Sequence, residues 1–411
     1  MKKNSPRRSI ISVLVALVVI GFGGYVATQN NTPKTDSPAV STVTGEDEEK
    51  QVGDLSRQSG PTLPSGVTVG AFGSLAPLKT DWYELYFTNP IYPDDPKNHK
   101  GGPDEPLVKM MDKATKTLDV ADYDFDLANV ADAMVRAKAR GVQVRMVTDS
   151  DTINNVKNKE VQDALSKLKK ANIPFIGDER GPIMHNKFTI VDNQWLSTGS
   201  MNYTDGDTYH LNNHLIILNY APLAQNYTAE FEKMFVKKQF GPNKDKGVPN
   251  PVVTIQGVKV ENYFAPEDGV AQRIIDTIAP AKQSVYFLAF SFTHDGIGQA
   301  IQDKAKAGLK VGGVFETTGS NTAFSEYGKM KQAGLEVYTD GNPWVMHHKV
   351  IIVDEQTVIF GSFNFSINAD KSNDENILIV HDPKMAKAFK AEYDRILDLA
   401  KNPPVKKATP K

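Results

Sequence analysis

The sequence predicts an α/β protein of two tandem α/β/α lobes, each built on a mixed, mostly parallel sheet and related to the other by pseudo-two-fold symmetry. Three observations predict this fold. A nine-residue motif occurs twice, the segments upstream of it also occur twice, and each copy alternates strand-like and helix-like stretches. Such alternation favours a largely parallel sheet with helices on its faces.

The motif "MHNKFTIVD" at residues 184–192 returns as "MHHKVIIVD" at residues 346–354, so that His347 lies 162 positions after His185. The same offset carries the later "GSMN" onto "GSFN". A strand projects alternate side chains to one face, so His185 and Lys187 point the same way beside an apolar run. A single triplet of this kind is usually a solvated strand end, but its repetition at a constant offset favours a functional site.

The upstream segments give the order of elements within each lobe. Three pairs of segments match between the halves, at offsets of 167, 167 and 162: "VADYDF" (120–125) with "FLAFSF" (287–292), "AMVRAKARGVQVRMVTD" (133–149) with "AIQDKAKAGLKVGGVFE" (300–316), and "LKKANIPFI" (168–176) with "MKQAGLEVY" (330–338). They predict strand, helix, strand and helix, followed by the motif strand. Gly141 and Gly308 are expected to end the first helix of each lobe.

These elements place the first lobe at residues 76–240 and the second at residues 252–400. The two are joined near residues 238–252, where Gly, Pro and Lys dominate. Residues 401–411, "KNPPVKKATPK", are expected to form a disordered tail.

Residues 1–31 predict a signal anchor or a signal peptide. Four basic residues precede an uncharged stretch whose apolar part runs from Ile10 to Val26, near the shortest length that spans a membrane. The basic end is expected inside, which puts the two lobes outside the cytoplasm, anchored to a membrane or secreted if the segment is cleaved. Residues 32–75, rich in Pro, Ser, Thr and Gly, are expected to be a flexible linker.

Two copies of HxKxxxxD, each followed after six residues by GSxN, resemble the phospholipase D superfamily, whose members hydrolyse or exchange phosphodiester bonds. The resemblance covers roughly residues 83–400. It implies one site formed by both motifs, in which one histidine attacks phosphorus to form a phosphohistidine and the other protonates the leaving alcohol. By resemblance His185 is the nucleophile and His347 the acid, whereas the residues alone support only the pair.

Phosphodiester chemistry explains the other motif residues. The diester oxygens must be neutralised before a nucleophile can approach, and Lys187 and Lys349 supply positive charge. The predicted hydrogen-bond donors to phosphate are Ser200, Asn202, Ser362 and Asn364. Asp192 and Asp354 complete the catalytic set of the motif, but their odd separation from the lysines favours an orienting or structural role over proton transfer.

A residue that orients the catalytic imidazole is expected beyond each motif. Glu375 lies 28 positions after His347, and in the family a carboxylate at such a place accepts a hydrogen bond from the imidazole. The matching position after His185 holds Asn213, whose amide carries no charge. The opposite assignment of the two histidines therefore stays open, because a charged partner would make His347 more basic. His348, at the variable position of its motif, is expected to be a bystander.

The first functional hypothesis is a membrane-tethered phospholipase D that hydrolyses the head-group phosphodiester bond of a phospholipid. The alternatives are a nuclease of the same superfamily, because the motif recognises the diester and not its substituents, and a cardiolipin synthase-like transphosphatidylase that uses an alcohol in place of water. A binding protein without activity is disfavoured, because both histidines and both lysines are present.

Charge and composition bear on the partners. The chain has 47 basic and 49 acidic residues, and without the first 30 residues 43 basic and 49 acidic residues remain, a net charge of −6. A non-specific nuclease usually has a basic surface, so this balance favours a phospholipid at a membrane surface over nucleic acid. No metal and no other cofactor is expected, since neither HxK copy has a zinc-ligand pattern and cysteine is absent. One chain carries both motifs, which predicts a functional monomer.

Overall fold

The structure, a computed structural model, describes residues 74–404. The expected signal segment (1–31), nearly all of the linker (32–75) and most of the tail (401–411) lie outside these residues. Helix α13 (Pro383–Lys401) extends one residue into the segment that was expected to be disordered. No helix within the described range combines the length and apolar character needed to cross a membrane.

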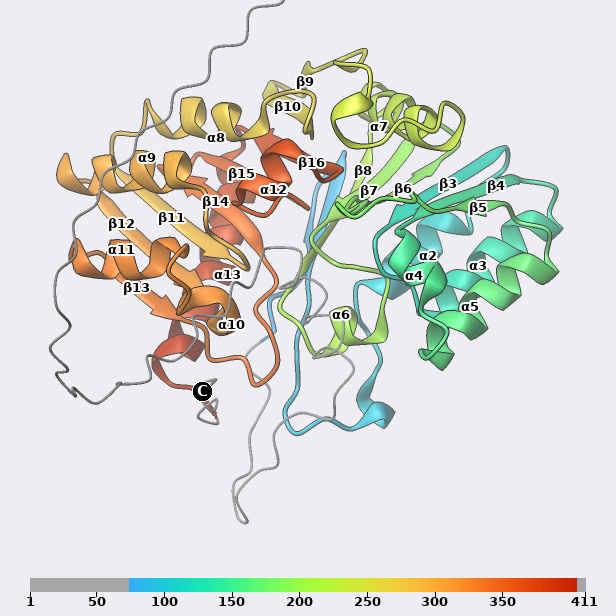
Figure 1. Cartoon of the computed structure of the whole chain (residues 1–411), viewed down its shortest axis with the longest axis horizontal. Helices are drawn as coiled ribbons and strands as arrows, with labels where there is room; N and C mark the ends of the chain where they lie inside the picture. The colour runs from blue at the N-terminus through green and yellow to red at the C-terminus, as the bar shows by residue number, and fades with distance from the viewer. Residues whose placement is uncertain (1–73, 405–411) are drawn as a thin grey trace, which may run out of the picture. The chain divides into compact units, whose positions relative to one another are not determined.

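Each lobe is built on an eight-stranded mixed sheet (Figure 1). The first sheet has the order β1 (Leu78–Lys79), β2 (Tyr83–Phe87), β8 (His214–Asn219), β7 (Trp195–Gly199), β6 (Lys187–Val191), β3 (Thr117–Asp122), β4 (Gln143–Thr148) and β5 (Phe175–Ile176). The second has the order β9 (Val252–Ile255), β10 (Val258–Ala265), β16 (Glu375–Val380), β15 (Thr357–Gly361), β14 (Lys349–Val353), β11 (Ser284–Ala289), β12 (Lys310–Phe315) and β13 (Glu336–Thr339). The identical order confirms two tandem lobes of one fold.

The expectation of mostly parallel sheets is wrong. Among the strands of the described residues, only β3–β4–β5 and β11–β12–β13 pair in parallel, and every other pairing is antiparallel. The motif strands β6 and β14 each return through a tight turn at Asp192–Asn193 and Asp354–Glu355, whose φ values are 54°, 53°, 54° and 52°. Two successive positive φ values are typical of the hairpin turn that joins antiparallel strands. The alternating helices upstream gave no sign of these hairpins.

The larger helices of the first lobe are α2 (Asp104–Met111), α3 (Ala128–Ala139), α5 (Lys159–Lys170) and α7 (Ala221–Phe235). Those of the second, besides α13, are α8 (Val270–Ile278), α9 (Asp295–Lys306) and α11 (Glu326–Gln332). Short helices complete the fold: α4 (Ser150–Asn154), α6 (Asp205–Tyr209), α10 (Thr317–Ser320), α12 (Ile367–Lys371), η1 (Pro96–Asn98) and η2 (Gly241–Asn243). Gly141 and Gly308 follow α3 and α9 with φ of 89° and 85°, as expected of glycines that end helices.

A central hydrophobic core joins the two lobes. It contains buried side chains from the motif strand β6 (Phe188), from α7 (Phe231), from β15 (Phe360) and from α13 (Phe389). Each lobe also has one core of its own, which lies between its sheet and helices on the sheet. These helices are α2, α3 and α5 in the first lobe and α8, α9 and α11 in the second. The shared core fixes the two motif strands relative to each other, because closely packed interiors resist displacement.

The segment that joins the lobes is also tied to both. Lys244, fully buried, lies 2.5 Å from Glu230, 3.1 Å from Glu267 and 2.9 Å from Asp374. Glu230 belongs to the first lobe and Glu267 to the second, and Asp374 directly precedes β16 of the second lobe. The Gly- and Pro-rich junction is therefore anchored by an internal cation.

Candidate active site

The two motifs meet through short pairings between the lobes. Met184 pairs with Asp374, and Asn212 pairs with Met346, as isolated parallel bridges. The backbone N–H of His185 donates to Asp374 O at 3.0 Å, and that of His347 donates to Asn212 O at 3.0 Å. Each motif therefore begins beside the segment that enters β8 or β16 of the other lobe. This arrangement brings both histidines, each with a fully buried side chain, to the junction of the lobes.

The first of two half-sites is built around His185. Its Nδ1 lies 2.7 Å from Glu375 Oε2, and the hydroxyl of Ser362 donates to the same carboxylate oxygen at 2.7 Å. Glu375 and Ser362 both come from the second lobe, and both are buried. With Nδ1 held by the carboxylate, chemistry at this ring would take place at Nε2. We call these three residues the His185 half-site.

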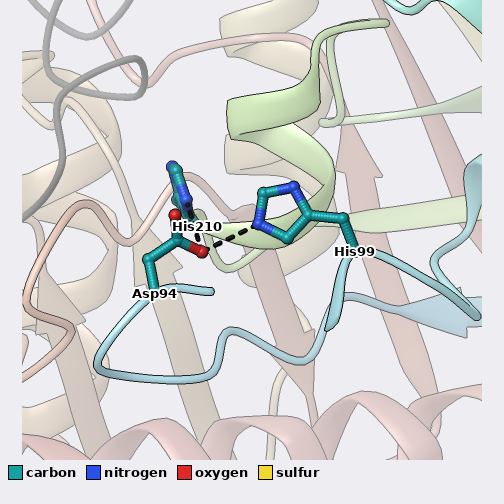
Figure 2. Close-up of side chains that lie close together, drawn as sticks. All are labelled: Asp94, His99 and His210. Atoms are coloured by element: carbon teal, nitrogen blue, oxygen red, sulfur yellow. Dashed lines mark hydrogen bonds and ion pairs between the residues drawn. The ribbon is translucent and has the colours of Figure 1, made fainter. Parts of the chain in front are cut away.

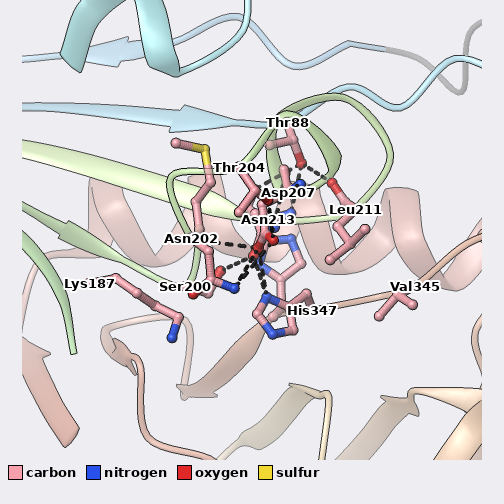
Figure 3. A network of polar contacts seen from close by, with 12 residues as sticks. Thr88, Lys187, Ser200, Asn202, Thr204, Asp207, Leu211, Asn213, Val345 and His347 are labelled. Carbon is pink, nitrogen blue, oxygen red and sulfur yellow. Dashed lines mark hydrogen bonds and ion pairs between the residues drawn. The ribbon is translucent and has the colours of Figure 1, made fainter. Parts of the chain in front are cut away.

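The second half-site is built around His347 (Figure 3). Its Nδ1 lies 3.0 Å from Asn213 Oδ1 and 3.3 Å from Asp207 Oδ1. The hydroxyl of Ser200 donates to Asn213 Oδ1 at 2.8 Å, as the hydroxyl of Ser362 does to Glu375 in the other half. We call His347, Asn213, Ser200 and Asp207 the His347 half-site.

The orienting residues are therefore crossed between the lobes. The prediction that Glu375 orients His347 and Asn213 orients His185, each within its own half, is wrong. Each partner stands at the start of the last strand of its lobe, and the pseudo-two-fold arrangement turns that strand entry toward the motif of the opposite lobe. Of these two residues, the charged one, Glu375, accordingly contacts His185.

Asp207 is a functional candidate that sequence reasoning missed. It lies in α6, where its Oδ1 accepts from the backbone N–H of Asn202 at 3.1 Å and from the Asn202 side-chain amide. Burial raises the pKa of Asp207, but hydrogen bonds from His347, Thr204 and Asn202 outweigh this effect and hold it below its usual range. The matching residue in α12 is Ala369. Comparison of the two halves therefore gave no signal, although an acid five residues after the Asn of the first GSxN was visible.

The motif lysines are buried beside the histidines. Lys187 Nζ donates to His185 O at 2.9 Å, and Lys349 Nζ donates to His347 O at 3.1 Å. Each ammonium also lies over an aromatic ring, 5.2 Å from the centroid of Tyr123 for Lys187. Phe290 takes the corresponding place 4.7 Å from Lys349 Nζ. Buried ammonium groups in these positions can neutralise the oxygens of an anion bound between the histidines.

The motif serines and asparagines have contacts that differ from the predicted donation to phosphate. Both serine hydroxyls donate to the orienting residues, and the Asn202 amide donates to Asp207. Asn364, the fourth predicted donor, is buried at the matching place in the second lobe. The preceding glycines are needed for close approach, since a Cβ on Gly199 would lie 2.3 Å from a carbonyl oxygen of β8.

Asp192 and Asp354 accept backbone hydrogen bonds at the hairpin ends of β6 and β14, which agrees with a structural role, and their place in the catalytic set stays a prediction. Asp192 accepts hydrogen bonds from the backbone N–H groups of residues 115–117 at 2.7 to 3.3 Å. Asp354 accepts the corresponding bonds from residues 282–284 at 2.7 to 3.2 Å. Each carboxylate fixes the start of a neighbouring strand at the hairpin end of the sheet.

His348 faces away from the half-sites but takes part in a buried contact between the lobes. Its Nδ1 lies 3.0 Å from Nδ1 of His214, and its Nε2 lies 2.9 Å from Glu392 Oε1. Burial lowers the pKa of both rings. The matching pair in the other half is Asn186 and Asn376, joined by an amide hydrogen bond of 2.8 Å. The interpretation of His348 as a bystander to the chemistry stays a prediction.

The geometry agrees with a known protein family. A family model described as "Cardiolipin synthase, PLD-like domain" matches residues 107–235 and 274–397, one match in each lobe. Together the matches cover more than half of the 411-residue chain and include both histidine motifs. Two mixed α/β lobes that share one histidine pair define the class, and the chain belongs to the phospholipase D superfamily.

Two relatives show how far the sequence likeness extends. A protein named phospholipase D from Rickettsia prowazekii is 34% identical over 130 residues, which is 32% of this chain and 63% of that protein. Mitochondrial cardiolipin hydrolase from Chlamydomonas reinhardtii is 30% identical over 190 residues, 40% of this chain and 85% of that protein. The chain thus covers less than two thirds of the length of the rickettsial relative.

A solved structure of similar fold covers about three quarters of this chain. Phosphatidylserine synthase from Haemophilus influenzae covers 76% of this chain and 85% of its own, with a TM-score of 0.56 and 14% identity, a likeness of fold alone. Nuc from Salmonella typhimurium, described as a phospholipase D family member, is 32% identical over 34% of this chain and 95% of its own, with a TM-score of 0.33.

Proposed function

We propose that the protein hydrolyses the head-group phosphodiester bond of a phospholipid through a phosphohistidine intermediate. The observation that carries the proposal is the crossed pair of half-sites. Two buried histidines from separate motifs each have Nδ1 on a partner from the opposite lobe, with a buried lysine beside each ring. Two imidazoles with fixed orientation and two cations are the groups that phosphodiester cleavage requires.

The roles of the histidines in this proposal are those that the family resemblance implies. Nε2 of His185 attacks phosphorus, and the carboxylate of Glu375 stabilises the charge that develops on this ring. His347 gives its proton to the oxygen of the leaving alcohol as the P–O bond breaks. The now neutral His347 then takes a proton from water, whose oxygen attacks phosphorus while the P–N bond to His185 breaks. Asp207, whose Oδ1 lies 3.3 Å from Nδ1 of His347, helps to fix the orientation of this ring.

The substrate assignment is supported by the names of relatives and by charge. The rickettsial and algal relatives are named for phospholipase D and cardiolipin hydrolase activities. The charge of −6 beyond residue 30 gives no excess of basic groups to collect nucleic acid. We further propose that residues 1–31 hold the protein at a membrane, outside the cytoplasm, beside its substrate. The family description "Cardiolipin synthase" favours exchange with an alcohol as the second candidate reaction.

A parallel assay of the full-length chain tests the proposal. Vesicles of phosphatidylcholine, phosphatidylglycerol or cardiolipin, and single-stranded DNA, are incubated with enzyme, with and without glycerol. We expect phosphatidic acid from at least one lipid in water and no cleavage of DNA. The His185→Ala variant provides the inactive control, and His381→Ala, which changes a histidine of the second-lobe surface, is the matched active control. Cleavage of DNA without lipid turnover would assign the protein to the nuclease branch, and lipid exchange without hydrolysis would assign it to the transferase branch.

A further inference from the structure

Three side chains outside the half-sites bring their donor atoms together. Asp94, His99 and His210 each offer one ligand atom, and these atoms all lie within 4.8 Å of one another. Asp94 Oδ1 lies 2.8 Å from His99 Nε2 and 3.2 Å from His210 Nε2 (Figure 2). Figure 2 shows both rings directed at the same carboxylate oxygen.

Two separate segments of the first lobe supply these residues. Asp94 and His99 flank η1 in the connection between β2 and α2, and the backbone N–H of His99 closes this turn by donating to Pro96 O. His210 follows α6 directly and donates its backbone N–H to Gly206 O at 2.8 Å. The cluster therefore closes a loop of more than a hundred residues, and sequence reasoning had no motif that would have linked its parts.

The surroundings resemble those of a bound metal ion. Nδ1 of His99 lies 3.0 Å from the carboxylate of Asp205, which fixes the ring so that Nε2 faces the cluster. A metal-bound histidine commonly has such a carboxylate on its other nitrogen. Both rings are also held by stacking, His99 on Tyr209 at 4.4 Å and His210 on Trp344 at 4.5 Å between centroids.

Space for a further ligand adjoins the cluster. A cavity of about 310 Å³ is lined by Asp94 and His99 and is large enough for several waters. Zinc bonds of about 2.0–2.1 Å to nitrogen and oxygen place tetrahedral donors roughly 3.3 Å apart. The Asp94–His99 and Asp94–His210 separations lie within about 0.5 Å of that spacing, a change that small side-chain rotations supply.

We propose that Asp94, His99 and His210 form a binding site for one divalent first-row transition metal ion, with Zn²⁺ as the representative, and a water from the cavity as fourth ligand. Two imidazole nitrogens and one carboxylate oxygen suit Zn²⁺ and its neighbours, whereas Mg²⁺ and Ca²⁺ prefer ligands that are all oxygen. The site is separate from the reacting histidines and takes no part in the transfer of the phosphoryl group.

The site lies where a bound ion would stabilise the junction of the two lobes. His210 lies three residues after Asp207 of the His347 half-site. Its carbonyl accepts from the side-chain amide of Asn342 at 3.0 Å, and its ring stacks on Trp344, both in the second-lobe segment that leads to His347. An ion here joins the connection before α2 to this junction of the lobes, so its binding is expected to raise thermal stability.

Metal binding by the full-length chain tests the proposal. The protein is dialysed against EDTA, the chelator is removed, and Zn²⁺ is titrated by calorimetry, with Co²⁺ absorption as a report of coordination. We expect one Zn²⁺ per chain, a rise in the thermal midpoint and a Co²⁺ spectrum typical of a four-coordinate site. His99→Gln should weaken Zn²⁺ binding at least about 100-fold, and Asp205→Asn, which removes only the outer partner, by about 10- to 100-fold.

The controls separate this site from other histidines. His381 pairs with Glu261 at 2.9 Å in the second lobe and is not part of a three-ligand group among residues 74–404, so His381→Gln should leave Zn²⁺ binding unchanged. Asp94→Asn preserves the shape of the side chain. If this variant unfolds cooperatively without metal, a loss of Zn²⁺ binding is not a loss of fold. Turnover after dialysis against EDTA should persist while the thermal midpoint falls.

Three results would overturn the proposal. These are no saturable Zn²⁺ binding by the wild type, binding that is lost on His185→Ala or His347→Ala but kept on His99→Gln, and a His99→Gln chain that retains the wild-type Co²⁺ spectrum. The first would leave Asp94, His99 and His210 as a hydrogen-bonded cluster that stabilises the loop without an ion.

Discussion

The two half-sites occupy matching positions in the two lobes, but the carboxylate beside the imidazole comes from a different position in each. In the His185 half-site, the carboxylate of Glu375 contacts the imidazole directly. Ala369 in α12 of the same lobe as Glu375 carries no charge. In the His347 half-site, the residue matching Glu375 is the amide of Asn213, and the residue matching Ala369 is the carboxylate of Asp207. Each imidazole therefore has one carboxylate, supplied from one of two neighbouring positions.

The difference shows that the two halves share a carboxylate beside the imidazole but not the position of the residue that supplies it. The Asn213 side-chain amide donates to Asp207 Oδ1 at 3.1 Å, so a carboxylate at residue 213 would face a second carboxylate in a buried site. Such a pair is unfavourable because like charges in a poorly solvated site repel strongly. Asn213 is accordingly the residue that Asp207 allows, and the apparent loss of an acid in the first half is compensated within the same half.

The largest expected effect comes from removing either ring. His185→Ala and His347→Ala should each lower kcat by at least about 10⁴-fold, because neither imidazole can perform both the attack and the protonation. Turnover of phospholipid vesicles, together with far-UV circular dichroism to verify the fold, measures this. Retention of a few per cent of activity in either variant would contradict a shared two-histidine site.

The roles of the two rings can be separated by trapping. With a substrate whose leaving group needs no protonation, His347→Asn should accumulate a phosphoryl adduct on His185, because the base that activates water is missing. His185→Asn should accumulate none. Rapid quench and mass spectrometry of acid-labile phosphopeptides locate the adduct. An adduct on His347 in the His185→Asn chain would reverse the assignment and would mean that the Glu375 carboxylate marks the acid.

An exchange of charge within the His347 half-site tests compensation. Asn213→Glu alone should lower kcat by about 10- to 100-fold, because it adds a carboxylate beside Asp207. Combining it with Asp207→Ala reproduces the arrangement of Glu375 and Ala369, and should recover at least about tenfold of the lost activity. Kinetics of the two single variants and the double variant give the coupling. Additive losses would show that the two carboxylate positions are not equivalent.

The smallest effect on activity is expected at the hairpin aspartates. Asp192→Ala should reduce the free energy of unfolding by about 1–2 kcal/mol, since the carboxylate accepts several backbone hydrogen bonds, while kcat changes little. Asp354→Ala should cost less, because Asp192 also accepts from the hydroxyl of Thr115 at 2.6 Å and Asp354 has no matching hydroxyl bond among residues 74–404. Urea unfolding of both variants and the wild type measures the difference.

The same variants have a defined pH dependence. Burial raises the pKa of Asp192 and Asp354, but the hydrogen bonds outweigh it and hold both below their usual range in the folded protein. Their contribution to stability is therefore present above the unfolded pKa of about 3.9 and is lost as the pH falls through the folded value. The gap between wild type and variant should be constant near neutral pH and shrink below about pH 4. A gap that widens on acidification would contradict the hydrogen-bonding role.

Much of the fold and of the candidate site could be predicted from repetition alone. The constant offset between the motifs predicted two lobes, and the His-x-Lys spacing predicted that each ring would have a lysine beside it. The sheets were predicted to be mostly parallel because the repeated upstream segments alternate strands and helices. That prediction failed at Asp192–Asn193 and Asp354–Glu355, where two-residue turns produce antiparallel hairpins that an apolar run ending in aspartate does not reveal.

The sequence by itself determined which residues are duplicated, because a repeat is a property of the chain and survives any folding. Only the tertiary structure decided which residues meet. Glu375 contacts His185 from 190 positions away, and Asp94 and His99 meet His210 across more than a hundred residues. The strand entries of one lobe face the motif of the other because a shared hydrophobic core fixes both sheets. Contacts set by such long-range packing leave no local pattern in the sequence.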